Sequence, residues 1–506
     1  MREKKNFKIM FVYPNLMLQT TFPTGIALLS AKLKENGYNS CLFDTTFYQT
    51  EKVSSDEYRM EHLQLARFNM GDKFKGLPSK SKMLEDLQGM ISHEKPDLIA
   101  YSFVEDVFPL TLELLEITKK FRIPTLAGGL FPTFAPEKVI KTEGIDMICI
   151  GDGENVILDL CNCLSTRKDY YNIPGLWIKS FGEIIRNNMG AYTDINTNPL
   201  PDLDMFDERR FYRPMKGKLL RQGVLETDRG CPYTCAYCNT YGQELNYKIN
   251  NNTKYFRLRD IGRVHDQLKI LVNKYKVEFI YMAAEVLFAM PKEHRKEFVK
   301  MYSKFKIPFF CQNRAEVINE ETVHDLETMN CHSCSLGLEH GNDEFRKIML
   351  NRRVTNDTYI RALKCFKNSK ITVSVNNIIG FPDETRDLVF ETVELNRNIK
   401  DYVFQINAYY FVPYHGSPLR QICLDKGYIS EDEQVTHITR DTILNSPYLS
   451  REEIRGLVRT FTLYTRFPKN RWEDIRIAEN FDKKGNKMFA KLQEEYWNKH
   501  LHVNAA

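Results

Sequence analysis

The sequence predicts an α/β protein with three folded regions: a doubly wound parallel sheet, a partial barrel of six strand-helix units, and a helical C-terminal region. With 506 residues, of which 42% are hydrophobic, the chain exceeds one ordinary domain and can bury more than one core. Short β-branched runs alternate with amphipathic helical segments in two successive series, which is typical of parallel sheets. We therefore expect domains at residues 1–164 and 223–418, joined by a connector at 165–222 and followed by a helical domain at 419–506.

The first series of strands and helices lies in the N-terminal domain. Pro14 ends the first strand, Gly37 stops a helix predicted at 24–36, and a polar, helical insertion is expected between Thr45 and Pro96. The strands are predicted at residues 8–13, 40–43, 98–103, 125–127 and 147–150. Ligands of such sheets bind beyond the carboxyl ends of the strands, so the loops that follow the strands are candidate binding loops. These loops comprise residues 14–23, 102–106, 128–133 and 151–154.

Glycines occur in two of these loops, as the pair Gly128-Gly129 and in the segment GDGE that begins at Gly151. Paired glycines let the backbone come close to a bulky ligand. No GxGxxG pattern follows the first strand, so a dinucleotide is poorly supported. Taken alone, each glycine-rich loop is better explained by turn chemistry.

The second series begins after a connector that contains a hairpin, predicted at 176–186 about Gly182, and a segment rich in Pro and Asp. Its strands are predicted at residues 224–228, 279–284, 308–313, 333–339, 372–379 and 404–411. Its helices are predicted at residues 261–275, 292–305, 320–329, 355–368 and 384–399. Six strand-helix units indicate a partial barrel rather than a complete eightfold one.

Charge and composition narrow the class of protein. The 71 basic and 66 acidic residues are interspersed along the chain, which argues against a dedicated nucleic-acid binder. The N-terminus has no signal-peptide pattern, and no apolar run approaches the length that spans a membrane. Twelve cysteines are spread thinly through the chain, as in a protein of a reducing compartment. We therefore expect a cytoplasmic protein.

Three cysteines, Cys231, Cys235 and Cys238, crowd into one loop after the first barrel strand. Thiolates at this spacing can converge on one 4Fe-4S cubane, and three ligands leave one iron open for chemistry. A structural zinc site would need a fourth ligand, and no His or Cys follows within the next twenty residues. Disulfides are disfavoured in a reducing compartment. An iron-sulfur cluster is the interpretation that the loop supports best.

A second pair of cysteines, Cys331 and Cys334, forms a CxxC motif on a predicted strand. An odd separation along a strand directs two side chains to opposite faces, so the two thiols are poorly placed to chelate one metal ion. We expect both side chains to pack in the core.

The cysteine loop, with an aromatic residue before its last Cys, resembles that of the radical S-adenosylmethionine superfamily. Over residues 7 to 420 the chain resembles the cobalamin-binding subgroup of that superfamily, often called class B methyltransferases. The further similar segments, in order, are PTGIALLSAKLKENGY, AGGLFPTFAPEKVI, GDGE, GLEHGNDEFRKIML, IGFPDET and FVPYHGSPL. Each segment is weakly diagnostic alone, but their ordered combination is strong.

This resemblance implies a Rossmann-like cobalamin-binding domain, a TIM-type radical S-adenosylmethionine barrel, and three cofactors: the 4Fe-4S cluster, S-adenosylmethionine and cobalamin. The cysteines would ligate the cluster, and its open iron would bind the amino and carboxylate groups of S-adenosylmethionine. The other implied contacts of S-adenosylmethionine are Tyr237, Glu285, Arg314, Glu339 and either Asn376 or Asn377. Strand parity leaves the choice between the two asparagines open, and a salt bridge at the end of the barrel would explain each charged residue equally well.

The implied cobalamin contacts lie in the loops of the N-terminal domain, at Pro14, Thr24, Ser102, Gly128, Gly129, Phe131, Thr133, Gly151, Gly153 and Glu154. The pattern DxHxxG, which carries a histidine ligand of cobalt, is absent, and the chain before residue 200 contains only His62 and His93. Phe131 stands where relatives often have a histidine in the motif GGxHPT. The resemblance therefore implies cobalamin bound without a histidine ligand.

The function implied is methylation of an unactivated carbon by means of a 5'-deoxyadenosyl radical and methylcobalamin. Cyclisation, ring contraction or oxidation without methyl transfer is the alternative, because fold and cofactor do not determine the reaction. A non-catalytic cluster-binding sensor is the reading from a different class. The implied partners are a small-molecule or lipid-like substrate and an electron donor such as flavodoxin or ferredoxin, with no nucleic acid.

Overall fold

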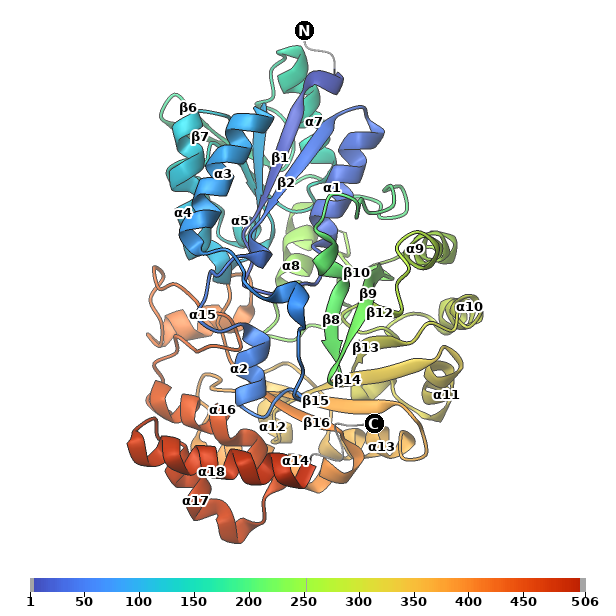
Figure 1. Ribbon diagram of the computed structural model, residues 1–506, viewed down its shortest axis with the longest axis vertical. Helices are drawn as coiled ribbons and strands as arrows, with labels where there is room; N and C mark the ends of the chain where they lie inside the picture. Colours follow the sequence, from blue (N-terminus) through green and yellow to red (C-terminus); the bar gives the residue numbers. More distant parts are fainter. Residues whose placement is uncertain (1–3, 252, 501–506) are drawn as a thin grey trace. The chain divides into compact units, whose positions relative to one another are not determined.

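The computed structural model describes residues 4–251 and 253–500, and the chain divides into two compact units (Figure 1). Unit 1 comprises Met1–Ser54, Gly71–Tyr212 and Gly242–Gln267. Unit 2 comprises Ser55–Met70, Arg213–Tyr241 and Leu268–Ala506. Within the described ranges, no helix has both the length and the apolar character needed to cross a membrane.

Unit 1 is built on a seven-stranded sheet with the order β2-β1-β3-β4-β5-β6-β7. Its first five strands are parallel, and β6 and β7 add an antiparallel hairpin at one edge. The strands are β1 (Lys8–Tyr13), β2 (Asn39–Asp44), β3 (Leu98–Ser102), β4 (Thr125–Gly128), β5 (Met147–Cys149), β6 (Leu176–Ser180) and β7 (Glu183–Arg186). The doubly wound sheet expected from the sequence is confirmed.

Helices cover both faces of this sheet, because its central strands are apolar on both sides. Helices α3 and α4 pack together on one face, and α1 and α7 pack together on the other (Figure 1). The helices are α1 (Thr24–Glu35), α3 (Lys80–Glu94), α4 (Phe108–Thr118), α5 (Leu130–Phe134), α6 (Pro136–Ile140) and α7 (Glu154–Thr166). Short 3₁₀ turns are η1 (Lys4–Asn6), η2 (Thr45–Phe47), η3 (Asp72–Phe74), η4 (Glu105–Val107), η5 (Lys119–Phe121) and η6 (Glu208–Phe211).

The strand order has a functional consequence. In the order 2-1-3-4-5, the direction of winding reverses between β1 and β3, and ligands of such sheets bind in the crevice beyond the carboxyl ends at this point. Pro14 follows β1, and Ser102 ends β3. The topology therefore brings two of the residues expected to contact cobalamin to the switch point of the sheet.

Unit 2 contains a curved seven-stranded sheet with the order β16-β15-β14-β13-β12-β9-β8. Six of these strands are parallel and form the expected partial barrel, which is confirmed. Strand β8 joins its edge through a turn at Lys216 and Gly217, which both have positive φ, as a tight two-residue hairpin requires. The strands are β8 (Tyr212–Met215), β9 (Lys218–Glu226), β12 (Phe279–Ala283), β13 (Phe309–Asn313), β14 (Cys331–Glu339), β15 (Thr372–Ile379) and β16 (Gln405–Tyr410).

Helices flank the outside of the barrel strands, and the last three form the helical C-terminal region (Figure 1). Among them, α16 packs against β16 and α14. The helices of this unit are α2 (Ser55–Glu61), α10 (Lys292–Tyr302), α11 (Glu320–Thr328), α12 (Asp343–Ile348), α13 (Asn356–Cys365), α14 (Arg386–Ile399), α15 (Pro418–Asp425), α16 (Arg451–Arg466), α17 (Trp472–Ala478) and α18 (Lys483–His500). Its short elements are β10 (Asp228–Arg229), η7 (Ala315–Val317), η8 (Lys400–Tyr402) and η9 (Lys469–Arg471).

Helix α8 (Asn239–Asn251), directly after the cysteine loop, and the short strand β11 (Arg257–Leu258) were not predicted, whereas α9 (Ile261–Asn273) matches the helix expected at 261–275. Both helices contain the boundary between the two units. The segment Ser55–Met70 lies within the insertion expected in the N-terminal domain, yet it packs with unit 2.

Candidate functional site

The loop that carries Cys231, Cys235 and Cys238 follows β10 in unit 2. Gly230 begins it with φ +94°, and the Ala236 N–H donates to the Leu350 carbonyl over 3.0 Å. Cys235 is a buried residue, whereas Cys231 and Cys238 are half-buried. The loop is thus held by the segment that follows α12, while two of its cysteines keep some exposed surface.

The chemistry of the loop fits a cluster better than a single ion. Among the described residues, no group of three or more His, Cys, Asp and Glu side chains converges closely enough to hold one metal ion. A cubane spreads its thiolate ligands over three different irons, so it suits a wider spacing. Burial raises the pKa of Cys231 to about 12 and that of Cys238 to about 11, so both groups are protonated thiols at neutral pH without metal. Binding of a metal would remove their protons and make them thiolate ligands.

Arg314 places a positive charge against this loop. It follows β13, its side chain is buried, and its Nη1 donates to the Cys235 Sγ over 3.0 Å. The Nε group also donates to Glu316 Oε1 over 3.1 Å, and the guanidinium lies 3.9 Å from the centre of the Tyr233 ring. A buried cation at the sulfur offsets the negative charge that thiolates and a cluster bring.

Two further expected residues, Tyr237 and Glu339, meet through an arginine that the sequence analysis missed. Arg352 is buried, and its Nη1 lies 2.9 Å from the Tyr237 hydroxyl and 3.2 Å from Glu339 Oε1. Its Nη2 donates to the Gly337 carbonyl over 2.7 Å and to the Tyr359 hydroxyl over 2.8 Å. Burial raises the pKa of Glu339, and the Arg352 charge opposes that rise. Arg352 therefore fixes the orientation of both side chains.

Asn376 and Asn377, which are adjacent on β15, point to opposite faces of the sheet. Asn376 faces the interior, where its Nδ2 donates to Ser335 Oγ over 3.1 Å. Asn377 faces away from the interior, is fully buried, and donates to the Asn407 carbonyl over 2.9 Å. Of the two asparagines that the sequence left open, only Asn376 reaches the interior, so we withdraw Asn377. Glu285 lies just beyond the carboxyl end of β12 and is exposed.

The residues expected to contact cobalamin lie in the loops and helix starts that follow the unit 1 strands, but four of them are buried, namely Pro14, Phe131, Thr133 and Glu154. Phe131 packs in the core, with its ring centre 5.0 Å from that of Phe108, so we withdraw it as a cofactor contact. The Thr133 hydroxyl donates to the Gly129 carbonyl over 2.8 Å, and Glu154 Oε1 accepts from Asn198 Nδ2 over 3.1 Å. The other expected contacts are Thr24, Ser102, Gly128, Gly129, Gly151 and Gly153, which present backbone or small side chains.

Gly129 shows why this edge of unit 1 needs glycine. Its φ is +108°, and a Cβ at this position would lie 2.5 Å from the Phe103 carbonyl oxygen. Any larger residue would push apart the loops that follow β3 and β4. The two loops can therefore approach each other closely beside the switch point.

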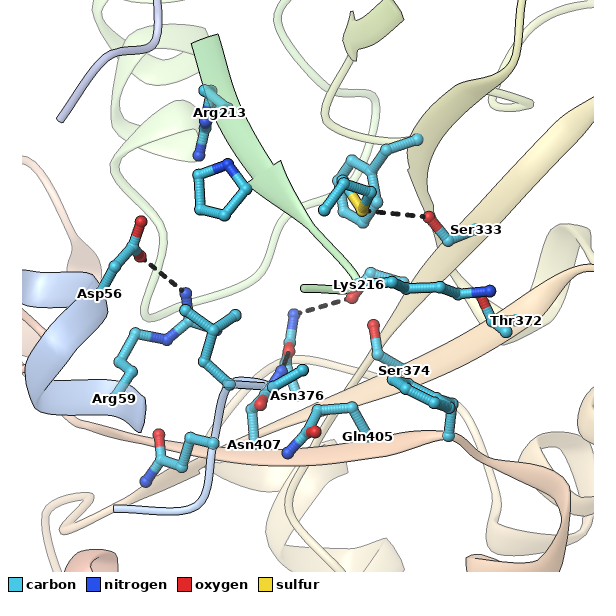
Figure 2. Close-up of a pocket in the computed structure, with 18 of the residues that line it drawn as sticks. Asp56, Arg59, Arg213, Lys216, Ser333, Thr372, Ser374, Asn376, Gln405 and Asn407 are labelled. Carbon is cyan, nitrogen blue, oxygen red and sulfur yellow. Dashed lines mark hydrogen bonds and ion pairs between the residues drawn. The ribbon is translucent and has the colours of Figure 1, made fainter. Parts of the chain in front are cut away.

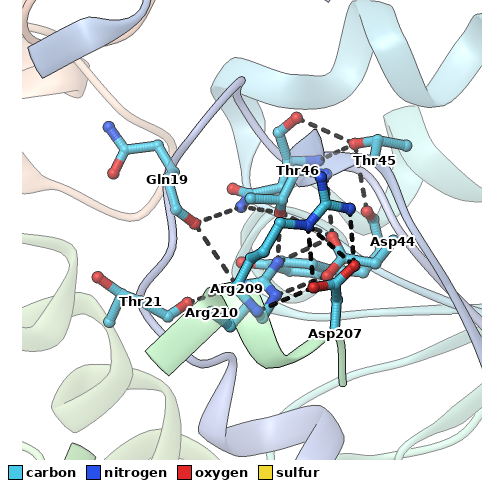
Figure 3. Close-up of polar contacts among 10 residues, drawn as sticks. Gln19, Thr21, Asp44, Thr45, Thr46, Asp207, Arg209 and Arg210 are labelled. Atoms are coloured by element: carbon cyan, nitrogen blue, oxygen red, sulfur yellow. Dashed lines mark hydrogen bonds and ion pairs between the residues drawn. The ribbon is translucent and has the colours of Figure 1, made fainter. Parts of the chain in front are cut away.

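A buried ion pair lies at the carboxyl end of β2, in the same sheet (Figure 3). Arg210, in η6, has no exposed side-chain surface, and its Nε donates to Asp44 Oδ2 over 2.6 Å while its Nη2 donates to Asp44 Oδ1 over 2.8 Å. It also contacts Thr46 Oγ1 and donates to the Thr21 carbonyl over 2.8 Å. No motif in the sequence singled out this arginine, which ties the connector to the carboxyl end of β2.

The interior of the barrel contains a cavity of about 290 Å³ (Figure 2). Side chains on the inner face of β12 to β16 form its wall, and the β8-β9 hairpin and α2 contribute the rest. Gln312 and Asn376 line it, on strands that also lead to Arg314 and Gly380 at their carboxyl ends. The cavity thus extends along the inner face of the strands that carry the candidate cofactor residues.

The expectation for Cys331 and Cys334 was wrong in its geometry. The pairing of β13 with β14 shifts between Phe309 and Phe310, so His332 is an extra residue that breaks the alternation of side chains. Cys331 Sγ lies 3.9 Å from Cys311 Sγ, and Asn313 Nδ2 lies 3.7 Å from the sulfurs of Cys311 and Cys334. All three thiols are buried on one side of the sheet, where they pack in the core as expected.

Comparison with known proteins places this geometry in a family. The family model described as the radical SAM superfamily matches residues 225–395, and the model described as the B12 binding domain matches residues 18–160. The chain is 24% identical over 383 residues to an uncharacterized methyltransferase of Pyrococcus horikoshii, covering 74% of this chain and 79% of the relative. It is 23% identical over 485 residues to the anaerobic magnesium-protoporphyrin IX monomethyl ester cyclase of Rubrivivax gelatinosus, covering 92% of this chain and 78% of the relative.

A solved structure has the same overall fold. The radical S-adenosylmethionine methyltransferase TsrM of Kitasatospora setae, with cobalamin and a 4Fe-4S cluster bound, superposes with a TM-score of 0.64 at 14% identity. The superposition covers 96% of this chain and 99% of that chain. The chain belongs to the radical S-adenosylmethionine enzymes that carry a B12-binding domain, and its cofactors are a 4Fe-4S cluster, S-adenosylmethionine and cobalamin.

Proposed function

We propose that this enzyme methylates an unactivated carbon of its substrate. The observation that carries the proposal is the Cys231–Cys238 loop, backed by Arg314, in a chain that also has a B12-binding domain. Relatives named as methyltransferases support the methyl-transfer version of the chemistry. When bound, the three cofactors supply a 5'-deoxyadenosyl radical and a transferable methyl group.

The residues of the chain hold and orient these groups. Cys231, Cys235 and Cys238 would ligate three irons of the cluster and leave one for the amino and carboxylate groups of S-adenosylmethionine. The Arg314 guanidinium would stabilise the charge at Cys235, next to which it lies. The other side chains that we assign to S-adenosylmethionine are Tyr237, Glu285, Glu339 and Asn376.

Arg352 acts on S-adenosylmethionine through its neighbours. It makes four contacts within the barrel and touches both Tyr237 and Glu339, so it holds them before the cofactor binds. Such preorganisation lowers the cost of ordering side chains on binding. We assign Arg352 as a positioning residue.

For cobalamin, the backbone at the carboxyl ends of the unit 1 strands would supply most contacts. Gly128, Gly129, Gly151 and Gly153 have no side chains to obstruct a bulky ligand. Neither of the two histidines before residue 200 lies in the loops expected to bind cobalamin, because His62 directly follows α2 and His93 lies on α3. These placements support cobalamin bound without a histidine ligand.

A second candidate function is cyclisation, ring contraction or oxidation without methyl transfer. The relative that covers 92% of this chain is named as a cyclase, which favours this alternative as specifically as the other names favour methylation. Both functions need a one-electron donor, for which we propose a flavodoxin or a ferredoxin. A small-molecule or lipid-like substrate is compatible with either reaction.

The first test is anaerobic purification with cobalamin supplied, followed by an optical spectrum and an iron count. We expect cluster absorbance together with corrinoid bands in the wild type. The triple variant C231A/C235A/C238A should lose only the cluster, and C365A, which alters a partly exposed cysteine elsewhere, should retain both cofactors. Cluster without corrinoid in the wild type would refute the methylcobalamin mechanism.

The mass of the product then separates the two candidate functions. A gain of one methylene group over the substrate means methylation. Loss of two hydrogens, or an unchanged mass, means the alternative reaction. If S-adenosylmethionine is not cleaved even under strong reduction, the chain is a cluster-binding sensor.

A further inference from the structure

The cavity inside the barrel has an excess of positive charge. Three cations line it, Arg59, Arg213 and Lys216, against one carboxylate, that of Asp56. The Asp56 carboxylate lies 3.6 Å from an Arg59 nitrogen, so it is already paired with one of the cations. Figure 2 shows these groups on the side of α2 and the β8-β9 hairpin, facing the inner surface of the barrel strands. An anion would balance this arrangement better than a neutral molecule would.

Lys216 is the cation that an anionic ligand would pair with. It lies in the turn of the β8-β9 hairpin, and its φ of +46° is a conformation that few residues other than glycine adopt. No residue in the part of the chain that the structure describes forms a hydrogen bond or an ion pair with its ammonium group, which lies 5.6 Å from the centre of the Phe404 ring. Burial lowers the pKa of Lys216, so its charge is destabilised as long as it lacks a partner.

The opposite wall of the cavity combines polar side chains with the aromatic rings of Tyr281, Phe310, Phe404 and Tyr409. Serine, threonine and amide side chains alternate with outward-facing apolar residues along the strands, so their polar groups face the interior. These side chains are Gln312, Ser333, Ser335, Thr372, Ser374, Asn376, Gln405 and Asn407. Hydroxyl and amide groups on this wall can form hydrogen bonds with a ligand, and the rings beside them offer apolar contact.

The positions along the strands indicate how a ligand would lie. Lys216 extends toward Ser333 and Thr372, near the start of β14 and β15 (Figure 2). Ser333 and Glu339 are six residues apart on β14, which corresponds to about 20 Å of extended chain. A group held by Lys216 would therefore be remote from the end of the barrel that carries Glu339 and Arg314.

We propose that the substrate is an elongated anion whose terminal carboxylate or phosphate group ion-pairs with Lys216, while its reacting carbon points to the carboxyl ends of the barrel strands. This inference rests on the proposed function, because it assigns the cavity to the substrate of that reaction. The anion is a binding handle that takes no part in the chemistry. Its role is to hold the reacting carbon in register with the cofactors.

The test uses three probes with the same carbon skeleton: glycerol, glycerate and glycerol 3-phosphate. Binding of each to the holoenzyme, loaded with cluster and cobalamin, is measured by isothermal titration calorimetry. We expect at least one anion to bind and glycerol not to bind. The tighter of the two anions identifies the handle as a carboxylate or a phosphate.

Variants locate the binding. K216M should weaken anion binding about tenfold or more, the usual effect of losing a charge-assisted hydrogen bond. K216R, which keeps the charge, should bind nearly as well as wild type, which shows that any loss in K216M comes from its missing charge. Lys218 is two residues away, exposed and outside the cavity lining, so K218M should bind like wild type.

Two results would overturn the inference: neither anion binds better than glycerol, or K216M and K218M bind the anion equally well. Cleavage of S-adenosylmethionine by the wild-type holoenzyme is measured in parallel. If the anion binds but S-adenosylmethionine is not cleaved, the proposed reaction is contradicted and the anion site is retained. If S-adenosylmethionine is cleaved but no anion binds, the anion site is contradicted and the proposed reaction is retained.

Discussion

Replacing Arg210 with methionine should destabilise unit 1 strongly. The change removes two hydrogen bonds to Asp44 and one to the Thr21 carbonyl, from a side chain with no exposed surface. It leaves the Asp44 carboxylate, only 11% exposed, without its cation. Breaking a buried ion pair in this way costs about 3–5 kcal/mol in the free energy of unfolding.

The neighbouring Arg209 provides the matched control. It pairs with Asp207 over 2.7 Å, but both side chains are about one third exposed. An exposed pair contributes at most about 1 kcal/mol, so R209M should be nearly silent. The double variant D44N/R210M should regain part of the loss, because it no longer buries an unpaired charge.

Tryptophan fluorescence can report on unit 1 separately. The chain has three tryptophans, and Trp177 is in unit 1, whereas Trp472 and Trp497 are in unit 2. In a W472F/W497F background, urea unfolding followed at Trp177 therefore measures unit 1. R210M should lower the midpoint by about 1–2 M urea. A midpoint within the range of R209M would refute the reasoning about the buried pair.

Three further predictions follow from single side chains. R352M should weaken binding of S-adenosylmethionine to the cluster-loaded enzyme about tenfold, as measured by calorimetry. R353M, which changes an exposed residue, should bind S-adenosylmethionine like the wild type. Equal affinities of the two variants would contradict the positioning role of Arg352. G129A should lower the free energy of unfolding of unit 1 by about 2–4 kcal/mol and reduce its corrinoid content. G182A, where φ is also positive but no atom lies near the added Cβ, should lower it by about 1 kcal/mol. Equal losses would contradict the close approach of Gly129 to Phe103. Burial lowers the pKa of His62 to about 4, so the unfolded chain binds this proton more tightly than the folded chain does. His62 alone should therefore cost unit 2 about 3 kcal/mol as the pH falls from 6.5 to 4. H62N should reduce that slope in urea unfolding, and an unchanged slope would contradict it.

Strands with a regular pattern of burial were the easiest elements to predict. The expected strands 8–13 and 372–379 coincide with β1 and β15. In β15, inward and outward residues alternate strictly, so the period is visible in the residues themselves. The cysteine loop was also readable, because the spacing of three thiols within eight residues is itself typical of a cluster site.

Features that depend on pairing between distant segments were not readable. The shift that brings Cys331 and Cys334 to one side of the sheet is set by the partner strand β13, so local alternation gave the wrong faces. Arg352 meets Tyr237 across more than one hundred residues of sequence, and no motif links them. The cavity likewise combines residues from α2, the β8-β9 hairpin and five strands.

Because the cysteine loop is partly exposed, alkylation of its thiols can measure the fraction of molecules that carry a cluster. Five of the twelve thiols are partly exposed, namely Cys41, Cys163, Cys231, Cys238 and Cys365, and the other seven are buried. Because burial raises the pKa of all five, an alkylating reagent should modify up to five sites on the native apoprotein only at a pH alkaline enough to form their thiolates. Ligation of Cys231 and Cys238 would remove two of them, so mass spectrometry of alkylated samples would report the fraction of molecules that carry a cluster without any optical signal.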